Sequence, residues 1–167
     1  VLLTTTDAAL VANLSVRLAP LGLRLNQVIS KGAPTISWRI VGRGKGHANP
    51  LRTALQSLSL AVRSEAKFIP PAYFNASATQ RLDLLRGLLD TDGTVDKLGV
   101  VSFTTSSPRL ARDVQQLAWS LGCIATPGAV KHPTYSHRGE QRTGLPAHTL
   151  FLQHPEPATL FTLSRKV

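Results

Sequence analysis

The chain has 167 residues, 43% of them apolar and 5% aromatic, so it can bury a core made mainly of aliphatic side chains. No apolar run approaches the roughly 18 residues that a membrane-spanning helix needs, and the single cysteine, Cys123, cannot form a disulfide within the chain. A net charge of +10, with more arginine than lysine, favours nucleic acid as the partner and leaves simple solubility as the alternative. We therefore expect a cytoplasmic protein in a reducing compartment, with no membrane partner.

Residues 1–22 and 101–122 are two copies of one pattern. Aligned without a gap, six positions are identical, namely Val1, Thr4, Thr5, Leu10, Leu21 and Gly22 and their counterparts 100 residues later. Each copy predicts a short alternating strand, at Val1–Thr5 and Val101–Thr105, followed by a helix with an apolar stripe that ends at a glycine. Two unrelated strand–helix units could match by coincidence, but this number of identities favours an internal repeat.

After each copy, alternating apolar residues predict a pair of strands, and a capped apolar stretch predicts a short closing helix. The expected strand pairs are Arg24–Ile29 with Thr35–Val41 and Cys123–Lys131 with His148–Leu152, and the expected closing helices are Pro50–Leu58 and Pro155–Leu163. These elements define a first half over 1–62 and a second half over 80–167. Residues 63–79 hold two prolines and several turn formers and are expected to be a linker.

A leucine-rich helix over about Thr79–Thr91 opens the second half, and acids stand at its end where a basic residue is expected. Asp90 and Asp92 face the negative end of the helix dipole, which costs up to about 1 kcal/mol per charge. A cation at Asp92 would offset this cost, since Mg²⁺ binds one or two carboxylates together with water and phosphate oxygens. The alternative is a plain turn, in which the aspartates accept hydrogen bonds from nearby amides. The positions of Gly93 and Val101 exclude a calcium-binding EF-hand loop.

The stretch "LRGLLDTDG" (85–93) resembles the motif that names the LAGLIDADG homing endonucleases. It matches that motif at Leu85, Gly87, Leu88, Asp90, Asp92 and Gly93. The segments "KFIPPAYFNASATQRLDLLRGLLDTDG" (67–93), "TTSSPRLARDVQQLAWSLG" (104–122) and "LFTLSRK" (160–166) are similar to parts of the intein-encoded members of that family. The resemblance covers essentially the whole chain.

The resemblance implies an α+β fold in which two halves, each ordered helix–strand–strand–helix–strand–strand–helix, are related by a pseudo-twofold axis. In that family two motif helices pack side by side, and two antiparallel sheets form a saddle over duplex DNA. This chain is expected to lack only the first motif helix, so that its halves read ββαββα and αββαββα and the partner of Asp92 lies upstream of Val1. We expect a pseudo-dimeric monomer, in which the exposed motif helix could also pair two copies.

Three residues are expected to carry the chemistry. The resemblance implies that Asp92 binds Mg²⁺ and that Lys67, in "AKFIP", lies in the active site, where a lysine can stabilise the charge that develops on a phosphate. Lys166 lies one residue from the position that follows Lys67 by 100 residues, and is expected to be its counterpart. A solvated surface residue is the alternative for each lysine. Asp90 is expected to support the motif by capping or an ion pair rather than to bind metal.

Contacts with DNA are expected from the strands and their loops, where basic residues and histidines gather. The candidates are Arg24, Lys31, Arg39, Arg43, Lys45, Lys131, His132, Tyr135, Arg138, Arg142 and His148. The segment "VGRGKGH" (41–47) is a basic, glycine-spaced loop that could follow a phosphate backbone, but it lacks the spacing of a nucleotide-binding P-loop.

The expected function is site-specific, metal-dependent hydrolysis of both strands of a long double-stranded DNA target by the endonuclease domain of an intein. With one of the two acids absent, cleavage is expected to be weak or lost, and the residues that splice an intein are not present between Val1 and Val167. The arginine- and alanine-rich composition suggests an actinobacterial host protein, such as a replicative helicase. The alternatives are a non-catalytic DNA-binding module of the same fold, of the transcription-regulator type, and an RNA-splicing maturase.

Overall fold

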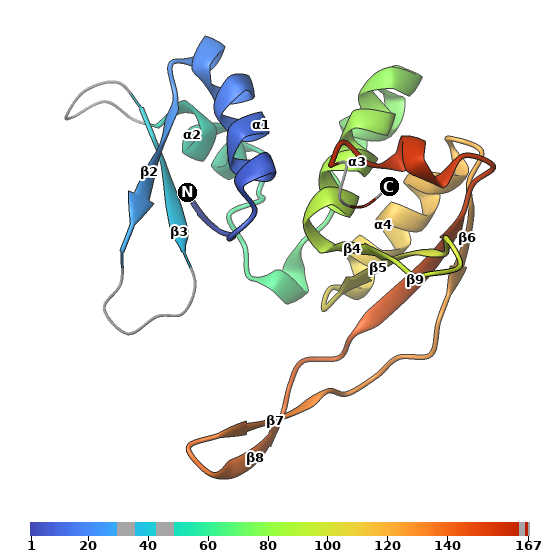
Figure 1. Cartoon of the computed structure of the whole chain (residues 1–167). Coiled ribbons are helices and arrows are strands. Elements are labelled where there is room, and N and C mark those ends of the chain that lie inside the picture. Colours follow the sequence, from blue (N-terminus) through green and yellow to red (C-terminus); the bar gives the residue numbers. More distant parts are fainter. Residues whose placement is uncertain (30–35, 43–48, 164–165, 167) are drawn as a thin grey trace. The chain divides into compact units, whose positions relative to one another are not determined.

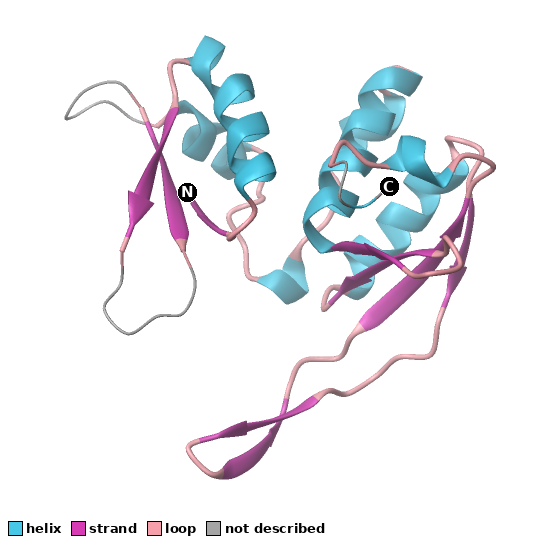
Figure 2. Ribbon diagram, viewed as in Figure 1, coloured by secondary structure: helices cyan, strands magenta, loops and turns pink. Residues whose placement is uncertain are grey.

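In the computed structural model, the chain forms two compact units, Val1–Ala61 (unit 1) and Val62–Val167 (unit 2). The structure describes residues 1–29, 36–42, 49–163 and 166. Figure 1 labels the elements in chain order, and Figure 2 shows that helices and strands are mixed in both units. The described strands of both sheets pair antiparallel, so the expected α+β class is confirmed.

Unit 1 is a three-stranded sheet with two helices. Its elements are β1 (Leu2–Thr4), α1 (Ala8–Leu18), the 3-10 helix η1 (Ala19–Leu21), β2 (Arg24–Val28), β3 (Ser37–Val41) and α2 (Pro50–Ser57), and its strands lie in the order β1-β3-β2. The Asp7 carboxylate caps α1 by accepting hydrogen bonds from two backbone amides, and the Asn49 side chain caps α2 by accepting one from the Arg52 amide. Leu18, Leu23 and Ile40 form a small buried core.

Unit 2 is larger and contains a four-stranded sheet in the order β4-β5-β9-β6. Its helices and strands are α3 (Ala78–Asp92), β4 (Gly93–Val95), β5 (Val101–Thr105), α4 (Pro108–Trp119), β6 (Ile124–Pro127), β7 (Thr134–His137), β8 (Glu140–Thr143) and β9 (His148–Gln153). Strands β7 and β8 form a separate hairpin between β6 and β9. The 3-10 helices η2 (Ser64–Ala66), η3 (Pro71–Asn75) and η4 (Pro157–Leu160) complete the unit.

Helices α3 and α4 share one core with the unit 2 sheet. Leu85 and Leu89 of α3 are fully buried, and they belong to the same apolar cluster as Val114 of α4 and Phe103 of β5. Buried and exposed residues alternate along β5, so one face of the sheet is packed and the other faces outward. Cys123 lies in this core, and its burial raises the pKa of the thiol above its ordinary value.

The pairing registers show the same repeat in both sheets. Leu2 pairs with Arg39 in unit 1, and Ser102 pairs with Phe151 in unit 2. The residues on β1 and β5 differ by 100 positions, as the sequence repeat predicts, whereas those on β3 and β9 differ by 112. The β2–β3 pair of unit 1 and the β6–β9 pair of unit 2 show the same two offsets. The connection before β9 is therefore 12 residues longer than the connection before β3, and the β7–β8 hairpin lies within it.

Three expected details of the element order are wrong. The residue pattern located no strand at β4, although the order αββαββα implied by the resemblance contains one; because its partner β5 corresponds to β1, unit 1 is ordered βαββα among its described residues instead of ββαββα. The strand expected over Cys123–Lys131 ends at Pro127, although the Gly128 and Lys131 amides still donate to the Thr149 and Ala147 carbonyl oxygens, and the hairpin follows. The helix expected over Pro155–Leu163 is reduced to η4. Thr35, the expected start of a strand, lies outside the described residues.

Both ends of α3 are set by local chemistry. At its start, Ser77 and Gln80 form a capping box, in which each side chain accepts a hydrogen bond from the other residue's backbone amide. At its end, Gly93 leads directly into β4, and a Cβ at this position would lie 2.5 Å from the Leu89 carbonyl oxygen. A Cβ at Gly87, in the middle of the helix, would meet no described atom within 4 Å. Of these two glycines, only the one at the helix end is therefore required by packing.

We predict opposite effects of alanine at these two glycines. Gly93→Ala forces the last turn of α3 to shift and should lower the free energy of unfolding by about 1 to 3 kcal/mol. Gly87→Ala should be neutral or should raise it by up to about 1 kcal/mol, because alanine favours the helix. Urea unfolding monitored by circular dichroism measures both values. Equal destabilisation by the two variants would contradict the predicted clash at residue 93.

Candidate functional site

The carboxylate of Asp90 is buried at the end of α3 and tied to the C-terminal segment. Its side chain is 4% exposed. One oxygen accepts hydrogen bonds from the backbone amides of Thr162 at 3.0 Å and Leu163 at 3.3 Å, and the other accepts from the Thr162 hydroxyl. A carboxylate engaged by three donors is stable when buried. Asp90 is therefore a structural residue that holds the segment after η4 against the motif helix.

The side chain of Lys166 covers the same helix end. Its ammonium group donates hydrogen bonds to the carbonyl oxygens of Leu89 at 2.8 Å and Gly93 at 2.6 Å, and lies 5.7 Å from the centre of the Phe161 ring. The last turn of α3 contains no basic residue of its own. The cation that the helix dipole favours at this end thus comes from a residue more than 70 positions away in the chain.

Asp92, the last residue of α3, differs from Asp90 in being exposed. Among the described residues, its carboxylate receives one long hydrogen bond, at 3.5 Å from the Thr91 hydroxyl, which also bonds to carbonyl oxygens of the preceding turn. The aspartate that caps the following turn is Asp96, whose carboxylate accepts from two amides between β4 and β5. The turn alternative expected Asp92 to accept hydrogen bonds from nearby amides; within the described residues it accepts none from an amide, and its oxygens remain available to a ligand.

The surroundings of Asp92 fit a metal that takes most of its ligands from outside the protein. Within the described part of the chain, no three His, Cys, Asp or Glu side chains come close enough to hold a metal ion. A closed zinc or calcium site is thus excluded there. Mg²⁺ and similar hard cations bind one or two carboxylates and fill their other positions with water and phosphate oxygens. Asp92 can supply one such carboxylate.

The segment that contains Lys67 is fixed against α4. The Lys67 carbonyl oxygen accepts a hydrogen bond from the Ser107 hydroxyl at 2.6 Å, and the Ile69 amide donates to the Asp113 carboxylate at 2.8 Å. The guanidinium of Arg109 lies 4.1 Å from the centre of the Phe68 ring. The backbone at residue 67 is therefore held in place while its side chain is exposed.

In unit 1, the candidate DNA contacts that the structure describes lie together. Arg24 and Asn26 on β2 and Arg39 on β3 are exposed, and Arg39 pairs with both Asn26 and Leu2 across the sheet. Side chains of directly paired residues, and of residues two apart on a strand, share a face, so both arginines lie on the outward face. Lys31, Arg43 and Lys45 lie outside the described residues.

In unit 2, most of the predicted contacts lie on the β7–β8 arm, defined here as residues 131–143 and including the hairpin in Figure 1. Every residue of the arm is exposed. It carries the candidates Lys131, His132, Tyr135, Arg138 and Arg142, and Arg142 also forms an ion pair with Glu140 at 3.1 Å. The candidate His148 lies apart from them, half-buried at the start of β9.

The outward face of the unit 2 sheet was not recognised from the sequence. It carries hydroxyl groups, with Thr94 bonded to Ser102 at 2.7 Å and Thr104 bonded to Thr149 at 2.9 Å. Phe151, at the position that corresponds to Arg39, is 44% exposed on this face. The alternation of residues in β5 and β9 could have indicated this face. It was missed because the DNA contacts were predicted mainly from charged residues, and serine and threonine carry no charge.

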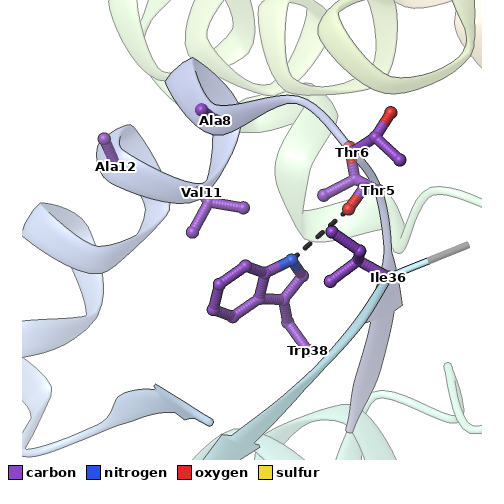
Figure 3. Close-up of a pocket in the computed structure, with 7 residues that line it drawn as sticks. All are labelled: Thr5, Thr6, Ala8, Val11, Ala12, Ile36 and Trp38. Carbon is purple, nitrogen blue, oxygen red and sulfur yellow. Dashed lines mark hydrogen bonds between the residues drawn. The ribbon is translucent and has the colours of Figure 1, made fainter. Parts of the chain in front are cut away.

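An apolar cavity of about 300 Å³ lies in unit 1 between α1 and the ends of β1 and β3 (Figure 3). Its lining residues are Thr5, Thr6, Ala8, Val11, Ala12, Ile36 and Trp38, and the Trp38 indole donates a hydrogen bond to the Thr5 carbonyl oxygen at 3.3 Å. These lining residues include no acid, base or thiol. In the part of the chain that the structure describes, no helix is long and apolar enough to span a membrane.

Comparison with known proteins shows which domain and which fold this chain resembles. Residues 79–144, from the start of α3 to the end of the β7–β8 arm, match the family model described as a LAGLIDADG-like domain. The fold also matches structures of the homing endonuclease I-DmoI at 14% sequence identity. Its mesophilic variants give a TM-score of 0.59 over 96% of this chain and 76% of theirs, and its complex with DNA and Mn gives 0.56 over 95% and 76%. The chain therefore carries a LAGLIDADG-like domain, and its fold is that of the LAGLIDADG homing endonucleases.

Two replicative DNA helicases also contain stretches similar to this chain. DnaB of Mycobacterium intracellulare is 35% identical over 140 residues, which are 83% of this chain and 22% of the helicase. DnaB of a Nostoc species is 38% identical over 85 residues, which are 47% of this chain and 10% of that helicase. The chain thus spans about a fifth or less of the length of these relatives.

We predict that Asp90 contributes to stability far more than an exposed acid on the same helix. Asp90→Ala removes the carboxylate that accepts from the buried Leu163 amide and from the amide and hydroxyl of Thr162, and should lower the free energy of unfolding by about 2 to 3 kcal/mol. Asp90→Asn keeps an acceptor oxygen and should lose less. Asp83→Ala removes only an exposed ion pair with Arg86 and should change stability by less than about 1 kcal/mol. Urea unfolding measures all three, and similar losses for Asp83→Ala and Asp90→Ala would contradict the structural role.

Proposed function

We propose that this chain is the DNA-binding endonuclease domain of an intein, and that it hydrolyses phosphodiester bonds at a long, specific site in duplex DNA. The observation that carries this proposal is the contrast at the end of α3. The Asp90 carboxylate and the carbonyl oxygens of Leu89 and Gly93 are hydrogen-bonded, whereas the Asp92 carboxylate is exposed and receives one long hydrogen bond among the described residues. Because the Asp92 carboxylate makes so little contribution to the folded structure, it is available to bind a ligand.

A divalent metal ion is the ligand that we propose for Asp92. When bound, such an ion would neutralise charge on the scissile phosphate and lower the pKa of a water molecule. Structures of I-DmoI contain target DNA with Mn, Mg or Ca, which supports a divalent ion without selecting one, and Mg²⁺ is our proposal. Lys67 is proposed to stabilise the negative charge that develops on the phosphate. The catalytic role expected for Lys166 stays a prediction, and its contacts favour a different role, argued below.

DNA binding is proposed for the outward faces of the sheets and for the β7–β8 arm. Arginine can contact phosphates or the guanine edge, whereas serine and threonine accept a wider choice of bases. Arg24 and Arg39 are therefore proposed contacts of unit 1, and the arm and the hydroxyl face are proposed contacts of unit 2. A two-stranded ribbon such as β7–β8 fits the major groove of B-DNA.

Cleavage of both strands requires two acids, and α3 supplies one of them. We expect this 167-residue chain to cut weakly or not at all, with any cut confined to one strand. The exposed side of α3 around Gly87 is the proposed contact surface for a second motif helix, either of the same protein or of another copy. The similarity to short stretches of two DnaB helicases supports a replicative helicase as host of the intein.

We predict that Asp92→Asn separates metal binding from DNA binding. Selection from a random duplex library would first identify a target. The variant should bind this target within about threefold of the original chain, because an acid does not attract phosphate, but should lose Mn²⁺ binding to the complex and any nicking activity. Asp96→Asn, which alters only the turn after β4, should retain both.

The same experiment distinguishes the alternatives. Tight Mn²⁺-independent DNA binding without any metal site in the original chain would favour the non-catalytic module. Preference for structured RNA over duplex DNA would favour the maturase. Either result would overturn the proposed nuclease function.

We predict that the unit 1 arginines bind DNA through the outward sheet face. Arg24→Ala and Arg39→Ala should each weaken target binding and should each reduce the slope of log affinity against log salt by about 1 if the residue contacts a phosphate. A base contact would instead change the preferred base at one position of the selected target. Arg52→Ala, on α2 of the same unit, is the control and should change neither quantity.

A further inference from the structure

The C-terminal strap, defined as residues 160–163 with Lys166, is anchored to unit 2 independently of any ligand. Leu160, Phe161 and Leu163 are at least 94% buried in the core. The strap is also held by the hydrogen bonds from Thr162 and Leu163 to Asp90. In addition, the guanidinium of Arg86, on α3, donates to the carbonyl oxygen of Thr159 just before the strap, at 2.8 Å. The position from which Lys166 approaches α3 is therefore fixed by packing.

The two carbonyl groups that Lys166 engages lie on either side of Asp92. Leu89 precedes Asp92 by three residues in the last turn, and Gly93 follows it as the first residue of β4. A single ammonium group thus ties the end of the helix to the start of the strand. Asp92 lies at the junction between them, so its backbone cannot move without stretching one of these hydrogen bonds.

From this geometry we infer that Lys166 is a positioning residue for Asp92, which acts by joining the last turn of α3 to β4 rather than by touching the phosphate. The inference rests on the proposed metal-binding role of Asp92. On this inference the strap, which follows the sheet in sequence, helps to set the affinity of Asp92 for the metal ion. Residues that orient a metal ligand typically change metal affinity by 10- to 100-fold when they are replaced.

The test compares Lys166→Met, Lys166→Arg and the control Lys97→Met, all in the full chain bound to its selected duplex. Lys166→Met keeps an apolar side chain of similar length without the donors, and should weaken Mn²⁺ binding, measured by electron paramagnetic resonance titration, at least tenfold. Lys166→Arg keeps donors for both carbonyls and should recover most of this loss. Lys97, exposed in the turn after β4, should have no effect.

Two further measurements separate positioning from a direct contact or a purely structural role. If Lys166 positions Asp92, Lys166→Met should leave the salt dependence of DNA binding unchanged; a decrease of about 1 in the slope would show a phosphate contact and overturn the inference. Hydrogen exchange of the free protein should become at least tenfold faster at the Gly93 amide, which bonds to Leu89, and not at the capping box around Ser77.

Unchanged exchange at Gly93 or unchanged Mn²⁺ affinity in Lys166→Met would each overturn the inference. Faster exchange throughout unit 2 would indicate a general structural role and would also overturn it. If the original chain binds no Mn²⁺ in the DNA complex, the proposed nuclease function fails, whereas the exchange measurement still reports whether Lys166 fixes the junction at Asp92.

Discussion

The buried carboxylate of Asp90 is the interaction on which the organisation of unit 2 depends. It accepts hydrogen bonds from two backbone amides and a hydroxyl of the C-terminal strap, so the last residues of the chain are held against the helix that begins the unit. An unpaired buried carboxylate would be costly, and unpaired buried amides would be costly too. Each therefore stabilises the other, and the pairing brings Lys166 to the end of α3.

Two aspartates separated by a single residue thus have different tasks. Asp90 lies on the packed side of α3 and its carboxylate is hydrogen-bonded within the protein, whereas Asp92 lies at the C-terminal end of the helix and is exposed. The negative end of the helix dipole makes this exit an unfavourable place for an acid, and the ammonium group of Lys166 offsets part of that cost through the carbonyl oxygens themselves. The fold can therefore present an unused carboxylate at a position where an isolated helix would disfavour it.

The two units keep one strand register but present different outward faces. Arginines on β2 and β3 in unit 1 correspond to Ile124 and Phe151 in unit 2. Lys131, Arg138 and Arg142 of unit 2 lie instead on the arm, which has no counterpart in the described residues of unit 1. Outward residues can differ between the two units without disturbing the packing of either core.

The sequence alone determined those features that depend on neighbours along the chain. The 100-residue repeat, the helices capped by Asn49 and Ser107, and the motif at Leu85–Gly93 are local patterns, and capping or apolar periodicity fixes them within a few residues. β4 was missed because three residues are too few to show alternation. The β7–β8 hairpin was missed because its strands are exposed on both faces and carry no apolar period. Only the tertiary structure decided which aspartate is buried and where Lys166 points, because both depend on contacts between residues more than 70 positions apart. No local pattern encodes such a contact, since it forms only when the core of unit 2 brings the strap onto the end of α3.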